Sequence, residues 1–409
     1  MKDLYNGRLY WLETLNDIRR YPSLTANKRT SVAIVGGGMS GSICGYVLAQ
    51  SGIDVCIVER GEIAGGSTAA NTGILQFCND VMLSELIGQI GRQDAVLFYK
   101  ACRDAVVHIG EIAAKLGKEV GFIPRSSLYY ASTEQDVPKL RKEFEALQGS
   151  GFDVEFWTGE EISIHYPFHK PAAIITRGDA EINPCGFVYA LADAAAAAGA
   201  SIHEHTDIVD HATAGEGIQR LTTSTGIVLE AEHVIYAVGY EPEELRGQLV
   251  KADVNRTYAL ATEPQPDLSA WKDNILIWET ARPYFYMRTT AEGRIIAGGH
   301  DEDNPKPLNS ESERRKRTDK LYDRIKEHFP LFTGRLEYDW TAVFGESRDN
   351  LPFIGEDPKW PGVYYCLGYG GNGTVYSMIA ANLLLNLIRG EEHPISHIVR
   401  LDRPSLESV

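Results

Sequence analysis

The feature that most constrains this chain is a GxGxxG pattern formed by Gly36, Gly38 and Gly41. It directly follows the apolar, β-branched run 31–35, which predicts a buried parallel strand. Residues 39–50 after it predict a helix. In such a turn the first glycine permits the sharp bend, the second lets backbone approach a pyrophosphate, and the third lets the helix pack on the strand.

The pattern continues into a second strand that ends in an acid. Residues 53–58 predict this strand, and Glu59 follows at roughly the 20-residue spacing at which an acid binds ribose hydroxyls. The start of the helix adds N–H groups and a positive dipole end for phosphates. The βαβ unit therefore predicts a bound dinucleotide, and by itself it does not choose between NAD and FAD.

Composition and charge bound the possible functions. The chain has 409 residues, of which 44% are hydrophobic and 23% are charged, so we expect a globular protein with two or more domains. The 40 Lys and Arg against 56 Asp and Glu give a net charge of −16. This balance disfavours nucleic acids and anionic membranes as partners.

The cysteines and the N-terminal residues predict a cytoplasmic protein. None of the six cysteines forms a CxxC pair, so we expect reduced thiols and no metal site. Residues 1–30 lack the apolar core of a signal peptide, and no run of about 18 apolar residues predicts a membrane span. A homo-oligomer is possible.

Two further glycine-rich loops are candidate ligand sites. The loop 61–77 directly follows Glu59 and is small and polar, so its backbone can come near a flat ring system. Ser67, Thr68 and Asn71 within it can reach phosphate or ring polar atoms. A second arrangement of strand, glycine loop and helix occupies residues 363–388, and the start of that helix can face an electron-rich group.

Between these parts the chain departs from βαβ alternation. Residues 122–157 predict strands around a charged helix, which we assign to a second domain. The later run 255–300 is also rich in strand patterns. Its period-two alternation places Tyr284, Tyr286 and Arg288 on one face of a strand.

Five features stand in one order along the chain: Gly36, Gly38 and Gly41 with Glu59; the loop 66–73; Thr206 and Ile208 before a predicted hairpin; the strand 234–239; and the segment 351–355 followed by the glycine loop 368–373. Together they resemble the D-amino-acid oxidase family of FAD flavoproteins, which includes glycine oxidase, sarcosine oxidase and γ-glutamylputrescine oxidase. The resemblance covers about residues 30–390. The N-terminal extension and the stretch ARPYFYMR (281–288) look most like the γ-glutamylputrescine oxidase branch.

The resemblance implies an α/β fold, α+β overall, with a Rossmann-type FAD-binding domain and a discontinuous second domain built on a β-sheet with helices. We expect the FAD-binding domain in residues 1–90, 170–240 and 335–409, and the substrate domain in residues 91–169 and 241–334. The FAD is expected to be non-covalent. The residues expected to bind it are Gly36, Gly38, Met39, Ser40, Gly41, Glu59, Arg60, Gly66, Ser67, Thr68, Asn71, Thr72, Gly73, Ile208, Ala237, Gly239, Arg348, Gly370, Gly371, Asn372, Gly373 and Thr374.

Members of this family oxidise a carbon–nitrogen bond. The resemblance implies that a hydride leaves the carbon next to a neutral amine for flavin N5, that the imine is hydrolysed, and that oxygen or another acceptor reoxidises the flavin. The substrate is then an amine or a (secondary) amino acid. The candidate catalytic residues are Tyr284, Tyr286, Arg288 and His300, which would form an aromatic wall and a cation over the flavin.

Three positions depart from the family pattern. Phe344 stands where amino-acid-oxidising members have an arginine for the substrate carboxylate. Ala342 stands where members with covalent flavin have a cysteine, and Val375 where some have a lysine that works with oxygen.

Two other functions therefore stay open. One is a 2-hydroxy-acid dehydrogenase, because the triplet 71–73 resembles that of related flavoproteins that oxidise carbon–oxygen bonds. The other is a flavin-binding subunit of a complex that has lost catalysis.

Overall fold

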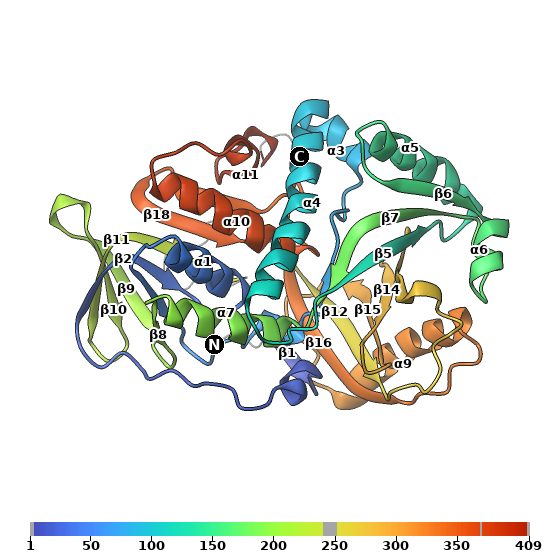
Figure 1. Cartoon of the computed structure of the whole chain (residues 1–409), viewed down its shortest axis with the longest axis horizontal. Helices are drawn as coiled ribbons and strands as arrows, with labels where there is room; N and C mark the ends of the chain where they lie inside the picture. The colour runs from blue at the N-terminus through green and yellow to red at the C-terminus, as the bar shows by residue number, and fades with distance from the viewer. Residues whose placement is uncertain (1–3, 240–251, 369, 407–409) are drawn as a thin grey trace.

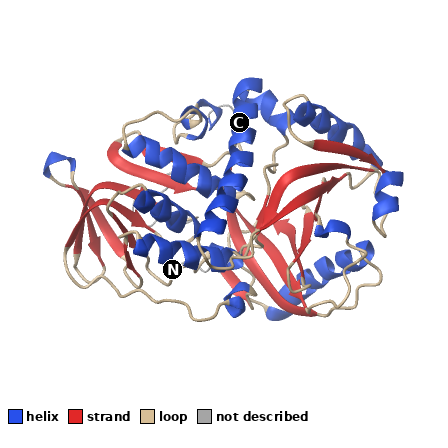
Figure 2. Cartoon of the chain, in the orientation of Figure 1, coloured by secondary structure: helices blue, strands red, loops and turns tan. Residues whose placement is uncertain are grey.

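Two β-sheets organise the part of the chain that the computed structural model describes, which is residues 4–239, 252–368 and 370–406. Figure 1 shows the two sheets as separate lobes, with the long helix α4 (Arg92–Lys115) standing between them. Helices and loops flank both sheets (Figure 2). This mixture of helices and sheets confirms the predicted fold class. Within the described residues, no helix is both long and apolar enough to cross a membrane.

The first sheet is built around the predicted βαβ unit. β2 (Lys28–Val35) pairs in parallel with β3 (Val55–Val58) on one side and with β11 (Val228–Tyr236) on the other. α1 (Met39–Gln50) connects β2 to β3 and has the predicted bounds. Because helices cover these strands, their centres are fully buried and read as continuous apolar runs.

The first sheet has eight strands in the order β17-β18-β11-β2-β3-β8, with β9 and β10 forming a hairpin extension beside β11. The strands not yet given are β8 (Ser201–His203), β9 (Ile208–Thr213), β10 (Gln219–Thr223), β17 (Phe353–Asp357) and β18 (Trp360–Leu367). The helices α7 (Pro184–Ala197) and α10 (Gly373–Ile388) pack on either side of α1. α1 therefore joins the N-terminal and C-terminal parts of this lobe (Figure 1).

The second sheet has ten strands in the order β1-β16-β12-β15-β14-β13-β5-β7-β4, with β6 paired to β7. Its strands are β1 (Tyr5–Gly7), β4 (Ile74–Leu75), β5 (Ile123–Tyr130), β6 (Val154–Thr158), β7 (Ala172–Glu181), β12 (Ala252–Thr262), β13 (Leu276–Glu279), β14 (Phe285–Thr289), β15 (Ile295–Glu302) and β16 (Leu336–Ser347). All described pairings in it are antiparallel except that of β13 with β5. α9 (Glu311–His328) packs against β12, β15 and β16.

The remaining described helices are α2 (Ser67–Ala70), α3 (Leu83–Ile90), α5 (Val137–Gln148), α6 (Gly159–His165) and α11 (Ser396–Val399), with short 3-10 segments at Trp11–Thr14, Glu134–Asp136, Gly215–Gly217, Lys272–Asn274 and Pro404–Leu406. α4 packs against α10 of the first lobe and β7 of the second. One hydrophobic core therefore runs through both lobes.

The sheet membership of several strands differs from the predicted domain boundaries. β1, β4, β7 and β16 lie in segments assigned to the FAD-binding domain, yet all four hydrogen-bond within the ten-stranded sheet. A short apolar strand has the same alternation in either sheet, so its sequence does not say which partner it pairs with. These four strands therefore join the sheet that also contains strands from the segments assigned to the substrate domain.

Candidate active site

The GxGxxG turn joins β2 to α1, and packing within the protein requires two of its glycines. Gly36 has φ +112°, and a Cβ there would overlap the carbonyl oxygen of Ala237, which follows β11. A Cβ on Gly41 would overlap the carbonyl oxygen of Gly36. These two glycines therefore let α1, β2 and β11 come close together.

Gly38 differs, because its backbone does not require glycine and a Cβ there would overlap no backbone atom of the described residues. Its φ of −79° and ψ of −162° are open to any residue. The one atom of the described residues within reach of a Cβ would be Thr68 Oγ1, at 3.1 Å. A small residue at the start of α1 therefore fits the close approach of a ligand rather than the packing of the chain.

Glu59 and Thr68 lie at the same end of the first sheet. The carboxylate of Glu59, directly after β3, accepts hydrogen bonds from the N–H groups of Gly37 and Gly61, both at 2.7 Å. Thr68 Oγ1 accepts from the N–H of Met39 at 2.9 Å and so caps the first turn of α1. A carboxylate keeps further lone pairs for ligand hydroxyls. Turn, acid and helix start thus meet at the carboxyl ends of parallel strands, where α/β sheets bind ligands.

The other residues predicted to bind the cofactor are distributed around this lobe. Ser40 Oγ shares a hydrogen bond of 2.8 Å with Ser377 Oγ, which links α1 to α10. Arg348 is exposed in the turn after β16. The others are Arg60 directly after Glu59, Gly66 before α2, the buried Ile208 at the start of β9, and Ala237 and Gly239 after β11.

The loop 71–73 is held from behind by two buried side chains. Trp11 Nε1 donates to the carbonyl oxygen of Asn71 at 2.6 Å, and Arg288 Nε donates to that of Thr72 at 2.8 Å. Within the loop, Asn71 Oδ1 accepts from the N–H of Gly73, whose φ is +72°. The loop is therefore fixed in one conformation by the ten-stranded sheet and the N-terminal residues.

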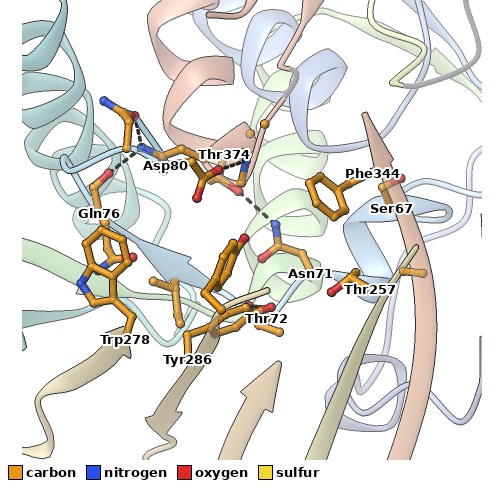
Figure 3. A pocket seen from close by; sticks show the side chains of 18 of the residues that line it. Ser67, Asn71, Thr72, Gln76, Asp80, Thr257, Trp278, Tyr286, Phe344 and Thr374 are labelled. Carbon is orange, nitrogen blue, oxygen red and sulfur yellow. Dashed lines mark hydrogen bonds between the residues drawn. The ribbon is translucent and has the colours of Figure 1, made fainter. Parts of the chain in front are cut away.

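A cavity of about 180 Å³ opens between this loop, the start of α10 and the ten-stranded sheet. Figure 3 shows Tyr286 with its hydroxyl directed toward the end of the cavity where Asp80 and Thr374 lie, and Trp278 and Phe344 to either side. Asn71 Nδ2 donates to Thr374 Oγ1 across 3.5 Å. The predicted site residues that line the cavity are Ser67, Asn71, Thr72, Tyr284, Tyr286, Gly370, Gly371, Asn372, Gly373 and Thr374.

Comparison with known proteins decides the family. Residues 31–387 match the family model described as DAO, FAD dependent oxidoreductase. The chain belongs to this family. It is therefore an FAD-dependent oxidoreductase, which confirms the resemblance seen in the sequence and the choice of FAD over NAD.

Two relatives and one solved structure agree with this assignment. Glycine oxidase from Geobacillus kaustophilus (strain HTA426) is 24% identical over 385 residues, which are 89% of this chain and 94% of the relative. Gamma-glutamylputrescine oxidoreductase from Escherichia coli (strain K12) is 22% identical over 403 residues, 93% of this chain and 89% of the relative. The crystal structure of glycine oxidase from Geobacillus kaustophilus has a TM-score of 0.80 at 22% identity, covering 92% of this chain and 99% of that one. The fold is therefore shared.

The residues present fit an FAD of this family. Gly38 leaves room at the start of α1, where the dipole of the helix favours a pyrophosphate. Glu59 offers a carboxylate at the end of β3. The start of α10 lines the cavity, so its dipole can favour negative charge on a ring system there. These residues would hold the two ends of the cofactor.

Two candidate catalytic residues do not line the cavity, and their expected roles need correction. Arg288 is 2% exposed, and it donates to the carbonyl oxygens of Thr72, Thr289 and Ile182. Alternation along β14 does place Arg288 on the same strand face as Tyr286. Arg288 is two residues further along the strand, however, and there it lies behind the loop 71–73. Its guanidinium positions that loop rather than a substrate.

His300 also lies away from the cavity. It has φ +57°, and its N–H donates to the carbonyl oxygen of Tyr284 at 3.0 Å. Burial lowers the pKa of its imidazole, as do the cations of α9 on that side, Arg324, Lys320 and Arg317. Strand alternation breaks at this residue because the pairing of β15 with β12 shifts register here.

Sequence reasoning missed Trp278 and Asp80, which line the cavity. Trp278 is stacked on Tyr129 with ring centroids 3.7 Å apart, and its Nε1 has no hydrogen-bond partner among the described residues. Asp80 accepts from the N–H of Gly371 at 2.9 Å, and so ties the segment before α3 to the glycine loop before α10. The aromatic content of the run 255–300 signalled Trp278, but no pattern around Asp80 signalled a contact so distant in sequence.

Asp301 is a third residue that sequence reasoning missed. It is next to His300, and its Oδ1 is buried with no hydrogen-bond partner among the described residues. The pKa of Asp301 is raised to about 7, chiefly by burial and also by the charges of Asp80 and Glu346, although a hydrogen bond with Thr257 and the charge of Arg282 act to lower it. Since Thr257 lines the cavity, Asp301 stands directly behind the cavity wall.

Proposed function

We propose that this enzyme oxidises the carbon–nitrogen bond of an amine or amino acid. One observation supports the proposal: the cavity lies between the loops that we expect to bind FAD and the aromatic side chains Trp278, Tyr284 and Tyr286. Two relatives are named for nitrogen-containing compounds, glycine and gamma-glutamylputrescine. When bound, FAD accepts the hydride that leaves the carbon next to the substrate nitrogen.

The side chains of the chain orient the substrate and exclude water. Burial raises the pKa of Tyr284 and of Tyr286 well above the usual value, so both hydroxyls stay protonated at neutral pH. They can donate hydrogen bonds and do not act as bases. Thr72 Oγ1 lies 3.4 Å from the Tyr286 hydroxyl and so holds that ring in place. The start of α10 supplies a positive dipole for charge that develops during the reaction.

Three further predictions belong to this proposal. The FAD is non-covalent, with Ala342 in the cavity lining where members with covalent flavin have a cysteine. The eight-stranded sheet with α1, α7 and α10 forms the FAD-binding domain, and the ten-stranded sheet with α9 forms the substrate domain. The protein works in the cytoplasm, which six free and buried cysteines support. Reoxidation of the flavin by oxygen or another acceptor, and a homo-oligomer, also stay predictions.

Anaerobic bleaching of the flavin tests the proposal. The purified yellow enzyme is mixed without oxygen with a panel of amines, amino acids and 2-hydroxy acids, and the flavin absorbance is followed. We expect amines or amino acids to bleach it and hydroxy acids to leave it oxidised. Bleaching by hydroxy acids alone would assign a carbon–oxygen dehydrogenase, and no bleaching by any class would favour a non-catalytic flavin subunit.

A further inference from the structure

The charge of the cavity points to the kind of substrate it holds. Among the described residues that line it, one has a charged side chain, and that residue is an acid, Asp80. Phe344 lines it where the family resemblance implies an arginine, and Arg288 faces the back of the loop 71–73. A substrate carboxylate would therefore meet no cation in this lining, and burying an unpaired carboxylate is costly.

Two more acids stand just outside the lining. Asp301 Oδ1 is buried without a hydrogen-bond partner in the described part of the chain. Glu346 is half-buried, accepts a hydrogen bond of 2.6 Å from Asn255, and has its pKa raised by burial and by Asp80. Like charges so close destabilise one another, and a cation bound among them would relieve the repulsion.

The aromatic lining suits the same kind of group. Trp278, Tyr284, Tyr286 and Phe344 all line the cavity. The faces of aromatic rings attract cations, more strongly where water is excluded. A cavity that combines aromatic faces with the carboxylate of Asp80 matches a ligand that brings N–H donors and positive charge.

Arg282 is the nearby cation that could argue for a carboxylate. Its guanidinium carbon lies 4.9 Å from the ring centroid of Tyr284, and Nη2 donates to the carbonyl oxygen of Asp80 at 3.1 Å. These contacts direct the charge along the outside of the cavity wall. Arg282 is therefore the competing site that an experiment has to separate from the acids.

We propose that the substrate is an amine that carries a second, non-reacting cationic group, that Asp80 contacts this group, and that the charges of Asp301 and Glu346 behind the lining favour it. The inference rests on the proposed function. The reacting nitrogen has to be neutral to release a hydride, whereas neighbouring acids keep an amine protonated. The acids therefore suit the other end of the molecule. A net charge of −16 also favours the approach of cations.

Equilibrium binding tests this without depending on turnover. The FAD-containing enzyme is reduced with dithionite at pH 8, so that no probe is oxidised, and titrated by calorimetry. The probes are 1,5-diaminopentane, pentylamine and 5-aminopentanoate, which share a length and differ at one end. We expect the diamine to bind roughly tenfold more tightly than pentylamine, and 5-aminopentanoate to bind most weakly.

Substitutions then locate the charge preference. Asp301→Asn should reduce the preference for the diamine over pentylamine by roughly fivefold or more, and Glu346→Gln should reduce it independently. Asp303→Asn is the matched control, because Asp303 is exposed two residues further along the chain and its substitution changes the net charge equally. The control should leave the preference unchanged. Retained flavin absorbance shows that each variant is folded.

Distinct results would overturn the proposal. Equal binding of diamine and pentylamine would do so, and so would a preference that persists in both Asp301→Asn and Glu346→Gln. If 5-aminopentanoate binds most tightly and this binding is lost in Arg282→Gln, Arg282 instead binds a substrate carboxylate. If any of these results is found while amines still bleach the oxidised flavin, only the proposal of a second cationic group is refuted. If hydroxy acids alone bleach the flavin, the proposed function itself is refuted.

Discussion

Gly38 shows how the reason for a residue can lie outside the chain. Gly36 and Gly41 are required because a Cβ would overlap backbone, whereas a Cβ at Gly38 would come near one hydroxyl only, Thr68 Oγ1. Packing within the described residues thus leaves room for a Cβ at position 38 once Thr68 shifts by a few tenths of an ångström. We infer that the glycine there serves the approach of a ligand to the start of α1.

Gly38→Val should therefore separate folding from cofactor binding. We expect a folded protein whose flavin content falls by roughly tenfold or more, because the two methyl groups occupy the space in front of the α1 N-terminus. Flavin absorbance relative to protein absorbance measures the content, and circular dichroism checks folding. Gly88→Val is the control, since a Cβ at that helical position meets nothing within 4 Å. Full flavin content in Gly38→Val would refute a role of Gly38 in cofactor binding.

Asp301 should make stability depend on pH. Burial raises its pKa to about 7 in the folded protein, so between its usual pKa of 3.8 and pH 7 the folded state binds a proton that the unfolded state has lost. Across that window its contribution to the free energy of unfolding falls by about 1.4 kcal/mol per pH unit as pH rises.

Asp301→Asn removes this titration, so the variant should be more stable than the parent at pH 8 and gain little at pH 4. Urea unfolding of both proteins with FAD present, at these two pH values, measures the difference. A variant that is less stable than the parent at pH 8 would show that Asp301 is ionised and stabilised in the folded protein.

At the scale of elements, the loop 71–73 depends on contacts from distant segments. Trp11 precedes it by many residues, and Arg288 comes from β14 in the other lobe. Arg288 also lies 3.6 Å from Glu181 at the end of β7. The loop is therefore positioned by the second sheet, although the sequence presents it as part of the nucleotide-binding unit.

Arg288→Met should loosen this loop. We expect a loss of about 3 kcal/mol in stability, because Glu181 loses one of its two cations and three carbonyl oxygens lose a donor. FAD affinity should fall with it, while the relative binding of cationic probes should not change. Thermal unfolding and FAD titration of the apoprotein measure both effects. Arg315→Met, on the exposed face of α9, is the control, and an unchanged FAD affinity in Arg288→Met would contradict the positioning role.

At the scale of the whole molecule, the C-terminal segment is held against the turn between β16 and β17. Arg403 and Asp349 are each 1% exposed at their side chains and form a pair of 2.6 Å. Arg403 also donates to the carbonyl oxygens of Leu351 and Pro352. Although burial raises the pKa of Asp349, the hydrogen bond and charge of Arg403 outweigh it and lower that pKa.

Arg403→Met should destabilise the whole fold by about 3–5 kcal/mol, because it leaves the Asp349 carboxylate buried without its cation. The urea midpoint measures the loss. Since Asp349 has a depressed pKa, the stability from this pair is present above its usual pKa of 3.8 and is lost as pH falls below it. Arg400→Met, which removes an exposed ion pair with Asp402, should change the midpoint little. Equal effects of the two substitutions would contradict this account.

The sequence alone determined the nucleotide-binding unit of this protein. Its signals are local: a glycine pattern, an apolar strand and a helix follow one another, and α1 has the predicted bounds of 39–50. The family and its FAD followed from the order of several such local signals along the chain. The glycine pattern, the strand and the helix each depend on neighbouring residues in the sequence and not on distant contacts. These conclusions could therefore be reached from the residues alone.

The tertiary structure alone decided which side chains surround the cavity. The alternation of Tyr284, Tyr286 and Arg288 is correct for one strand face, but only the packing of the loop 71–73 shows that the two tyrosines line the cavity and the arginine does not. Asp80, shortly after β4, and Asp301, in β15, interact although they are far apart in the chain, with no signal in the sequence between them. Their effect on a substrate depends on distance and burial, which arise when the two sheets pack against each other.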